Sequence, residues 1–185
     1  MSETAHRTAQ KIAAGLEQAF AKHGFAEPNV EVLRDAAGVS LRTLYKYMPS
    51  RSDMVLAALE HRHQRYLSHM FSALPEGAGA GAKGPTVFAE LLRRIGEWMV
   101  EEAAHGCLFH AAVAAAPTDQ ALQSLLQRHK AEVADKAARA VGLPDQSAAL
   151  LMIFEGVTQC WPLQGQDALH TAQALGRGLF AAELA

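Results

Sequence analysis

Apolar side chains recur every three or four positions along most of this 185-residue chain, which is the spacing of one face of an α-helix. In the first such segment, the residues that share a face are Ile12, Leu16, Ala19 and Phe20. No segment alternates apolar and polar residues with the period of a strand. The sequence therefore predicts an all-α fold with helices over residues 5–23, 30–37, 41–48, 50–74, 86–105, 108–115, 118–141, 145–160 and 167–184.

Residues that begin or end helices separate these segments. Asn29 and Ser40 are good N-cap residues for the second and third helices, because their side-chain oxygens accept hydrogen bonds from backbone N–H groups. Gly24 and Gly38 stand where helices end, and Pro49 stops the third helix. Residues 75–85, PEGAGAGAKGP, have the composition of a flexible loop. The later breaks are expected at Pro117, residues 142–144 and Pro162.

Two short helices joined through Gly38 are the pattern of a helix-turn-helix. The tight turn needs a residue that tolerates positive φ, and glycine does. Val39 and Leu44 would fill the small core between the two helices. The outward positions of the following helix hold hydrogen-bond donors and aromatic groups, namely Arg42, Thr43, Lys46 and Tyr47. Such a face suits the major groove of DNA and its flanking phosphates, although the same spacing also fits an ordinary amphipathic surface helix.

Composition and charge leave room for a nucleic-acid partner at the N-terminal end of the chain. Hydrophobic residues make up 50% of the sequence, enough for a core in one domain or in a small domain plus a larger one. Residues 1–66 carry nine Lys and Arg against seven Asp and Glu, and residues 67–185 carry eight against twelve. The net charges of +2 and −4 permit DNA binding by the first part and argue against it for the rest.

Cysteine usage and hydropathy indicate a cytoplasmic protein. Cys107 and Cys160 are the two cysteines, which is too few for a disulfide framework and favours a reducing compartment. The sequence has no signal-peptide pattern and no apolar run of about 18 residues, so we expect neither secretion nor a membrane span.

The N-terminal part of the chain closely resembles the DNA-binding domain of TetR-family transcriptional repressors. About 45 residues carry the resemblance, chiefly Phe20, Gly24-Phe25, Ala36-Ala37-Gly38-Val39-Ser40, Thr43-Leu44-Tyr45-Lys46-Tyr47 and Ser50-Arg51-Ser52-Asp53-Met54. The resemblance implies a three-helix DNA-binding domain at residues 1–50 and a helical ligand-binding and dimerisation domain at residues 51–185. It also implies a homodimeric repressor, released from its DNA operator by a small molecule, that is not an enzyme. We expect no cofactor.

The resemblance also implies roles for individual side chains on and after the third helix. Thr43, Tyr47 and Arg51 would hold phosphates, and Tyr45 would pack at the DNA backbone or touch it. The residues expected to face base edges are Leu41, Arg42 and Lys46. The family usually has glycine where Arg42 stands and an aromatic residue where Met48 stands, so the operator of this chain is expected to differ from those of glycine-bearing relatives.

A ligand cavity is implied by a second, shorter resemblance. Gly106-Cys107-Leu108-Phe109 resembles the start of the sixth helix of the family, which lies beside the usual cavity. The expected wall residues are His105, Phe109, His110, Val113, Trp98, Met99, Met152, Glu155, Gln159 and Trp161. Aromatic and methionine side chains make adaptable apolar linings, so the expected ligand is a hydrophobic small molecule. The same residues also suit a plain helical core.

The last two predicted helices are rich in Ala, Leu and Gly. Their apolar residues at helical spacing are Ala148, Leu151 and Met152 in one helix and Leu175 and Leu179 in the other. In the resembled family the last two helices form a four-helix dimer interface, so we expect a homodimer held there. Two-fold symmetry is also what a duplex with two half-sites requires.

Two motifs suggest other chemistry but fit it poorly. Gly79, Gly81 and Gly84 spell G-x-G-x-x-G, but no predicted strand precedes them, so this segment is expected to be a linker and not a dinucleotide site. Residues 60–69, EHRHQRYLSH, contain metal-binding residue types. Only two of these side chains could share a metal-binding face of one helix, so we expect a solvated basic surface.

A cysteine and two histidines keep an alternative function open. Cys107 and His110 are three residues apart, with His105 just before them, so they could act as a nucleophile and its base. Cys107 could also be a redox-sensitive thiol or a residue that lines a ligand cavity. The alternative to a DNA-binding repressor is therefore a helical enzyme or metal-binding protein that uses these three residues or the helix between His61 and His69.

Overall fold

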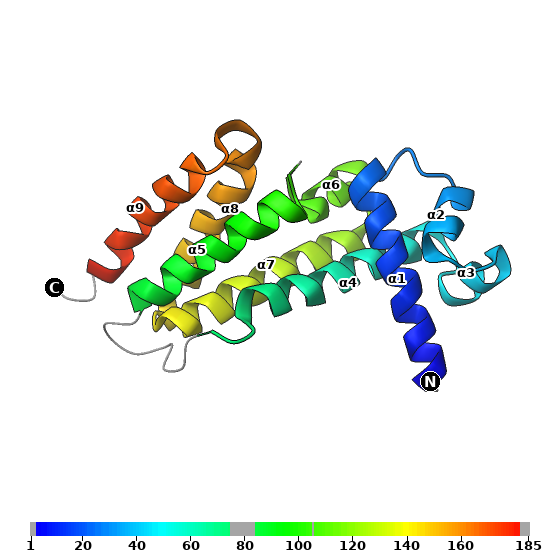
Figure 1. Cartoon of the computed structure of the whole chain (residues 1–185), viewed down its shortest axis with the longest axis horizontal. Coiled ribbons are helices and arrows are strands. Elements are labelled where there is room, and N and C mark those ends of the chain that lie inside the picture. The colour runs from blue at the N-terminus through cyan, green and yellow to red at the C-terminus, as the bar shows by residue number, and fades with distance from the viewer. Residues whose placement is uncertain (1–2, 75–83, 105, 182–185) are drawn as a thin grey trace. The chain divides into compact units, whose positions relative to one another are not determined.

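The computed structural model of the chain describes residues 3–74, 84–104 and 106–181. In that part of the chain it has nine α-helices, one short 3-10 turn and no strand (Figure 1). The bounds are α1 Glu3–His23, α2 Val30–Ala37, α3 Leu41–Tyr47, α4 Arg51–Phe71, α5 Gly84–Glu101, α6 Leu108–Ala115, α7 Gln120–Val141, η2 Pro144–Gln146, α8 Ser147–Gln164 and α9 Asp167–Ala181. The predicted all-α fold is confirmed.

The prediction of a break at Pro162 was wrong. α8 begins at Ser147, after the turn η2, and continues through Pro162 to Gln164. Proline removes one helical N–H hydrogen bond. The helix tolerates that loss here because it ends shortly afterwards, where the Gly165 N–H bonds to Trp161 O at 2.9 Å. Of the predicted loop over residues 75–85, residues 75–83 lie outside the described residues, and so do residues 182–184 of the last predicted helix. The prediction was wrong for Gly84 and Pro85, which form the start of α5.

The described residues divide into two compact units. The first falls within Met1–Arg65 and Leu108–Leu126, and the second within Tyr66–Cys107 and Gln127–Ala185. The expected division into residues 1–50 and 51–185 stays a prediction, because compactness does not test which residues bind DNA or a ligand.

The core of the first unit joins α1 to α2 and α3. The side chains of Leu16, Phe20, Leu33 and Leu44 are completely buried, with exposed fractions of 0%. Gly15 lets the backbones of α1 and α2 approach closely, since a Cβ atom there would lie 2.1 Å from Ala36 O. The local helix signals are therefore reinforced by a small apolar core, which fixes how α2 and α3 are held.

The core of the second unit centres on Phe88 of α5, with α8 and α9 alongside (Figure 1). The Phe88 ring stacks near Phe154 of α8 and meets Phe180 of α9 edge to face, with centroid distances of 6.3 and 5.8 Å. Gly176 of α9 leaves room for this ring, because a Cβ atom there would lie 2.1 Å from Phe88. α5 is thus the element against which both C-terminal helices pack.

A guanidinium group ties the end of α4 to α5 within the second unit. Arg94 donates hydrogen bonds to the carbonyl oxygens of His69 and Met70 in the last turn of α4, where helical partners are lacking, and of Ser72 just after it, at 3.2, 3.1 and 2.7 Å. Its Nε also donates to Glu90 at 2.8 Å. Hydrogen bonds from Arg93 first, and also from Arg94, lower the pKa of Glu90 to about 2, so this carboxylate stays charged.

Candidate nucleic-acid interface and pocket

The helix-turn-helix predicted over residues 30–48 is present, and its caps are those expected from the sequence. Asn29 Oδ1 accepts hydrogen bonds from the N–H groups of Glu31 and Val32 at 3.1 and 3.0 Å. Gly38 ends α2 in the left-handed conformation, with φ 62° and ψ 39°. Ser40 then caps α3, its Oγ accepting from the Thr43 N–H at 3.1 Å. These local interactions set the turn between α2 and α3.

The outward side of α3 carries the predicted donors. Leu44 faces the core with 0% exposure, whereas Tyr45 is 47% exposed. Arg42 and Lys46 are exposed as well, and Leu41, Thr43 and Tyr47 are half-buried. We call the set Leu41, Arg42, Thr43, Tyr45, Lys46 and Tyr47 the α3 face. The Lys46 ammonium lies 5.7 Å from the Tyr47 ring centroid, so charge and aromatic surface stand side by side on it.

Arg51, predicted to hold a phosphate, also has a structural role that the sequence did not reveal. Its guanidinium donates to Pro28 O at 2.8 Å and to Phe25 O at 2.7 Å. It also lies 5.8 Å from the centroid of the Phe20 ring. Arg51 therefore fastens the loop between α1 and α2 to the first turn of α4.

A buried carboxylate joins α1 to α4 behind the helix-turn-helix. Glu17 is 2% exposed and Arg62 is 3% exposed. The carboxylate accepts hydrogen bonds from Arg62 at 3.1 Å and Arg65 at 2.7 Å, and its other oxygen lies 2.5 Å from His61 Nδ1. We call these four residues the Glu17 cluster.

The expectation of a solvated basic surface over residues 60–69 was therefore wrong in part. Arg62 and His63 are buried, with exposed fractions of 3% and 0%. For Arg62, the opposite charge that makes burial possible comes from Glu17, which lies 45 residues away along the chain. In the sequence, the one sign of this cluster was the charged residue Glu17 among the apolar positions of α1.

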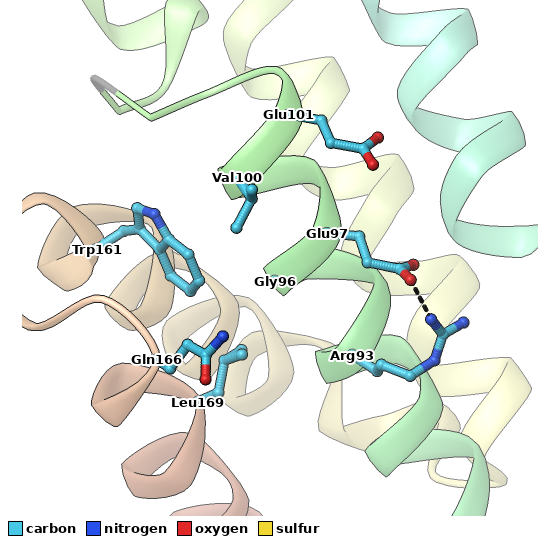
Figure 2. A pocket seen from close by; sticks show the side chains of 8 residues that line it. All are labelled: Arg93, Gly96, Glu97, Val100, Glu101, Trp161, Gln166 and Leu169. Atoms are coloured by element: carbon cyan, nitrogen blue, oxygen red, sulfur yellow. Dashed lines mark hydrogen bonds and ion pairs between the residues drawn. The ribbon is translucent and has the colours of Figure 1, made fainter.

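An open pocket of about 330 Å³ lies in the second unit, between α5 and the end of α8 with the start of α9. Its lining residues are Arg93, Gly96, Glu97, Val100, Glu101, Trp161, Gln166 and Leu169. Figure 2 shows the Trp161 ring facing Gly96 and Val100 across the pocket, while the carboxylates of Glu97 and Glu101 point away from it. Among the predicted wall residues, Trp161 is the one that lines this pocket.

The other predicted wall residues have varied surroundings. Trp98 and Met99 belong to the core of the second unit, with exposed fractions of 7% and 1%. Met152 is 76% exposed and Gln159 is exposed as well, so both lie at the surface of α8. The first unit contains Phe109, which is buried, and His110 and Val113, which are half-buried, all on α6. His105 lies outside the described residues.

Glu155, also predicted for the cavity wall, forms an ion pair that reaches Cys107. Lys130 Nζ lies 2.6 Å from Glu155 Oε1 and 3.5 Å from Cys107 Sγ. Both cysteines are half-buried, and neither forms a disulfide among the described residues. In the part of the chain that the structure describes, no group of three or more Cys, His, Asp or Glu side chains is placed to hold a metal ion. None of the helices described there is long and apolar enough to cross a membrane.

Comparison with known proteins identifies the fold. No family model and no curated protein matches the sequence. Among solved structures, the TetR-family transcriptional regulator SCO4454 from Streptomyces coelicolor superposes with a TM-score of 0.72 at 18% identity, over 95% of this chain and 96% of that one. Reduced NemR from E. coli gives 0.71 at 18% identity, over 94% and 97%. GusR from Salmonella enterica gives 0.68 at 20% identity, over 98% of both chains. The chain therefore has the fold of TetR-family transcriptional regulators.

Proposed function

We propose that this chain is a TetR-family transcriptional repressor that binds operator DNA as a homodimer and releases it when a small molecule binds. The observation that carries the proposal is the α3 face, a row of exposed and half-buried donors and aromatics on the second helix of a well-capped helix-turn-helix. No catalytic step is part of this function, and no cofactor is needed for it.

Contacts with DNA would be divided between bases and phosphates. α3 would enter the major groove, where the first turn of such a helix reaches base edges. We propose that Leu41, Arg42 and Lys46 face the bases. Phosphate contacts would come from Thr43, Tyr47 and Arg51, with Tyr45 against the DNA backbone.

Dimerisation would use the exposed apolar surface of α8 and α9. Met152, Leu163 and Leu175 are 76%, 84% and 63% exposed, which is unusual for large apolar side chains. Beside them lies a narrow groove of about 150 Å³ lined by Met152, Ile153, Gly156, Val157, Cys160, Gln164, Ala168, Thr171, Ala172 and Leu175. We call it the α8–α9 groove. A Cβ atom at Gly156 would meet nothing within 4 Å, so a partner helix could approach closely there.

Release from DNA would be a shift between two populations of the dimer. The effector would favour a spacing of the two α3 helices that no longer matches successive major grooves. The effector would be a small, mainly hydrophobic molecule bound by the second unit.

A mobility-shift assay with the DNA that flanks the gene of this protein tests the proposal. A specific complex should form, and its affinity should fall steeply between low and physiological salt because phosphate contacts release counterions. Lys46→Ala should weaken binding, whereas Lys136→Ala, which changes a half-buried lysine of α7 far from α3 in the sequence, should not. Failure to bind any flanking DNA, or binding that ignores salt, would favour the alternative of an enzyme or metal-binding protein using Cys107, His105 and His110.

A further inference from the structure

We infer that the pocket between α5, α8 and α9 binds a flat aromatic molecule that is neutral or cationic and carries a hydrogen-bonding group, stacked on Trp161. The inference rests on the proposed function in one respect, because it gives the effector of the repressor its chemical class. The binding itself can be tested without DNA.

The walls of the pocket make an apolar slot. On one side lie the backbone at Gly96 and the side chain of Val100, and on the other lies the half-buried indole of Trp161 (Figure 2). Leu169 lies at the end of the slot nearest α9, where a Cβ atom on Gly96 would come within 2.7 Å of its Cδ1. Glycine therefore lets Leu169 pack directly against the α5 backbone at the end of the slot, and the face of the Trp161 indole borders the space that remains.

The size and the aromatic wall define the apolar part of the ligand. The volume of about 330 Å³ lies near the lower end of the range of roughly 300–1,000 Å³ found for ligand pockets. A planar ring system can stack against an indole in an offset arrangement, which adds about 0.5–1.5 kcal/mol to the hydrophobic gain of burying it. A ligand of about the size of two fused aromatic rings would fit this volume and could stack on the indole.

One polar side chain can orient the ligand. Gln166, in the turn between α8 and α9, projects beside Leu169 at the edge of the pocket (Figure 2). Its amide offers both a donor and an acceptor. An amide, phenol or ring nitrogen on the ligand could pair with it, and Gln166 therefore favours a ligand with such a group over a pure hydrocarbon.

The charged residues of the lining carry a net charge of −1, which disfavours anions. The lining holds one guanidinium and two carboxylates, and the guanidinium of Arg93 is already bound to Glu90 and Glu97. Glu101 is exposed, and no ion pair with it is found among the described residues. These carboxylates point away from Trp161, so they act through their field and not by contact with the ligand. A negative potential at the mouth disfavours an anionic ring and tolerates a neutral or cationic one.

The slot is distinct from the proposed dimer surface. No residue that lines the pocket also lines the α8–α9 groove, although both include residues of α8 and α9. A second copy of the chain seated in the α8–α9 groove would therefore contact other residues than those that line the slot. Ligand binding and dimerisation can be measured separately.

The test uses the Trp98→Phe variant, which leaves Trp161 as the one tryptophan and hence one indole N–H signal in an ¹H–¹⁵N NMR spectrum. Circular dichroism first checks that the variant is folded. The probes share a naphthalene ring, namely N-acetyl-2-naphthylamine, 2-naphthyltrimethylammonium and 2-naphthalenesulfonate. We expect saturable shifts of the Trp161 signal with the first two probes and binding of the sulfonate that is about tenfold weaker or absent.

A variant that blocks the slot, in a protein that keeps both tryptophans, tests whether the probe binds there. Val100 is 62% exposed, so Val100→Arg should fold normally while its side chain lies across the indole. Calorimetric titration should then give at least about a tenfold loss of affinity for the neutral probe. The matched control is Val32→Arg, which introduces the same charge at a 41% exposed valine of α2 and should leave the affinity unchanged.

The outcomes separate the pocket from the proposed function. A Trp161 signal that none of the probes shifts, a sulfonate that binds as tightly as the others, or an unchanged affinity in Val100→Arg would each overturn the inference. If the neutral probe binds as expected but does not weaken a demonstrated operator complex, the slot binds aromatics but is not the effector site. If the probe binds and no operator complex forms at all, the proposed function fails while the binding stands.

Discussion

The hydroxyl of Ser52 donates a hydrogen bond to Asp119 Oδ2 at 2.8 Å, joining the first turn of α4 to the N-terminus of α7 within the first unit. The other oxygen of Asp119 caps α7, accepting from the N–H groups of Ala121 and Leu122 at 3.0 and 3.2 Å. Next to Ser52, Arg51 holds the loop between α1 and α2. Two consecutive residues thus fasten the start of α4 both to the helices that precede it and to the segment that follows α6.

The contribution of Asp119 to stability should disappear in acid. The hydrogen bond from Ser52 first, and then those from the backbone of Leu122 and Ala121, lower the pKa of this carboxyl from its ordinary 3.8. Because the folded-state pKa is the lower one, the stabilisation is complete above pH 3.8 and is lost as the pH falls through the folded-state value. Urea unfolding between pH 7 and pH 3 should therefore show the wild type losing stability in acid relative to Asp119→Asn, whose amide can still cap α7.

Ser52→Ala supplies the control for this interpretation. It removes the first cause of the lowered pKa while leaving the carboxyl in place, so its extra loss of stability in acid should be smaller than that of the wild type. If the free energy of unfolding changes with pH by the same amount in the wild type, Asp119→Asn and Ser52→Ala, the carboxyl does not stabilise the fold through these bonds.

Removing the charge of Glu17 should be among the most costly single changes in the first unit. Glu17→Gln keeps the shape of the side chain but leaves buried Arg62 opposite a neutral amide, and breaking a buried pair in this way costs about 3–5 kcal/mol. The measurement is the free energy of unfolding in urea at neutral pH. Glu27→Gln, at an exposed position outside the helices, should change it by less than about 0.5 kcal/mol. Equal effects of the two substitutions would mean that the Glu17 cluster is effectively solvated.

The sequence predicted best where the chemistry is local. Asn29, Gly38 and Ser40 each act on backbone groups within four residues, so the turn between α2 and α3 could be inferred without knowledge of the rest of the fold. The same reasoning missed the Glu17 cluster, because a helical pattern marks Glu17 and Arg62 as polar positions and says nothing about a partner 45 residues away.

The candidate pocket was hard to predict for a related reason. Periodicity gives the apolar faces of a helix but not which of them another helix covers, so the 76% exposure of Met152 could not be inferred from the sequence. The slot beside Trp161 exists because Gly96 and Leu169 bring α5 and α9 together, which is a contact between segments more than 70 residues apart. Its residues do not form a motif that can be recognised along the chain.

The apolar surface of α8 and α9 should hold the dimer. Met152→Glu combined with Leu175→Glu places charges on two exposed side chains that line the α8–α9 groove. Burying them against a partner would leave unpaired charges, so we expect monomers at concentrations where the wild type is dimeric. Light scattering coupled to size-exclusion chromatography measures this. Val32→Glu, which places one such charge at an exposed position of α2, should remain dimeric. A stable, folded dimer of the double variant would place the interface elsewhere.

Replacing Arg42 and replacing Tyr47 should change DNA binding in different ways. Arg42 lies in the first turn of α3 with its side chain exposed, where a guanidinium can pair with guanine O6 and N7, a contact worth about 1–3 kcal/mol of discrimination. Arg42→Gly should therefore relax the preference at one base pair per half-site while much of the non-specific affinity survives. Tyr47→Phe keeps the ring and removes one hydroxyl, so it should weaken binding to all sequences about equally.

Binding to a randomised operator library measures both effects for each variant. Glycine in a helix costs about 1 kcal/mol of stability relative to alanine, so Arg42→Ala is needed to separate the lost contact from a frayed helix. Both Arg42 variants should show the same relaxed position, because the cause is the missing guanidinium. If neither changes the base preference, Arg42 faces phosphate or solvent, and the arginine found where the resembled family has glycine does not alter the operator.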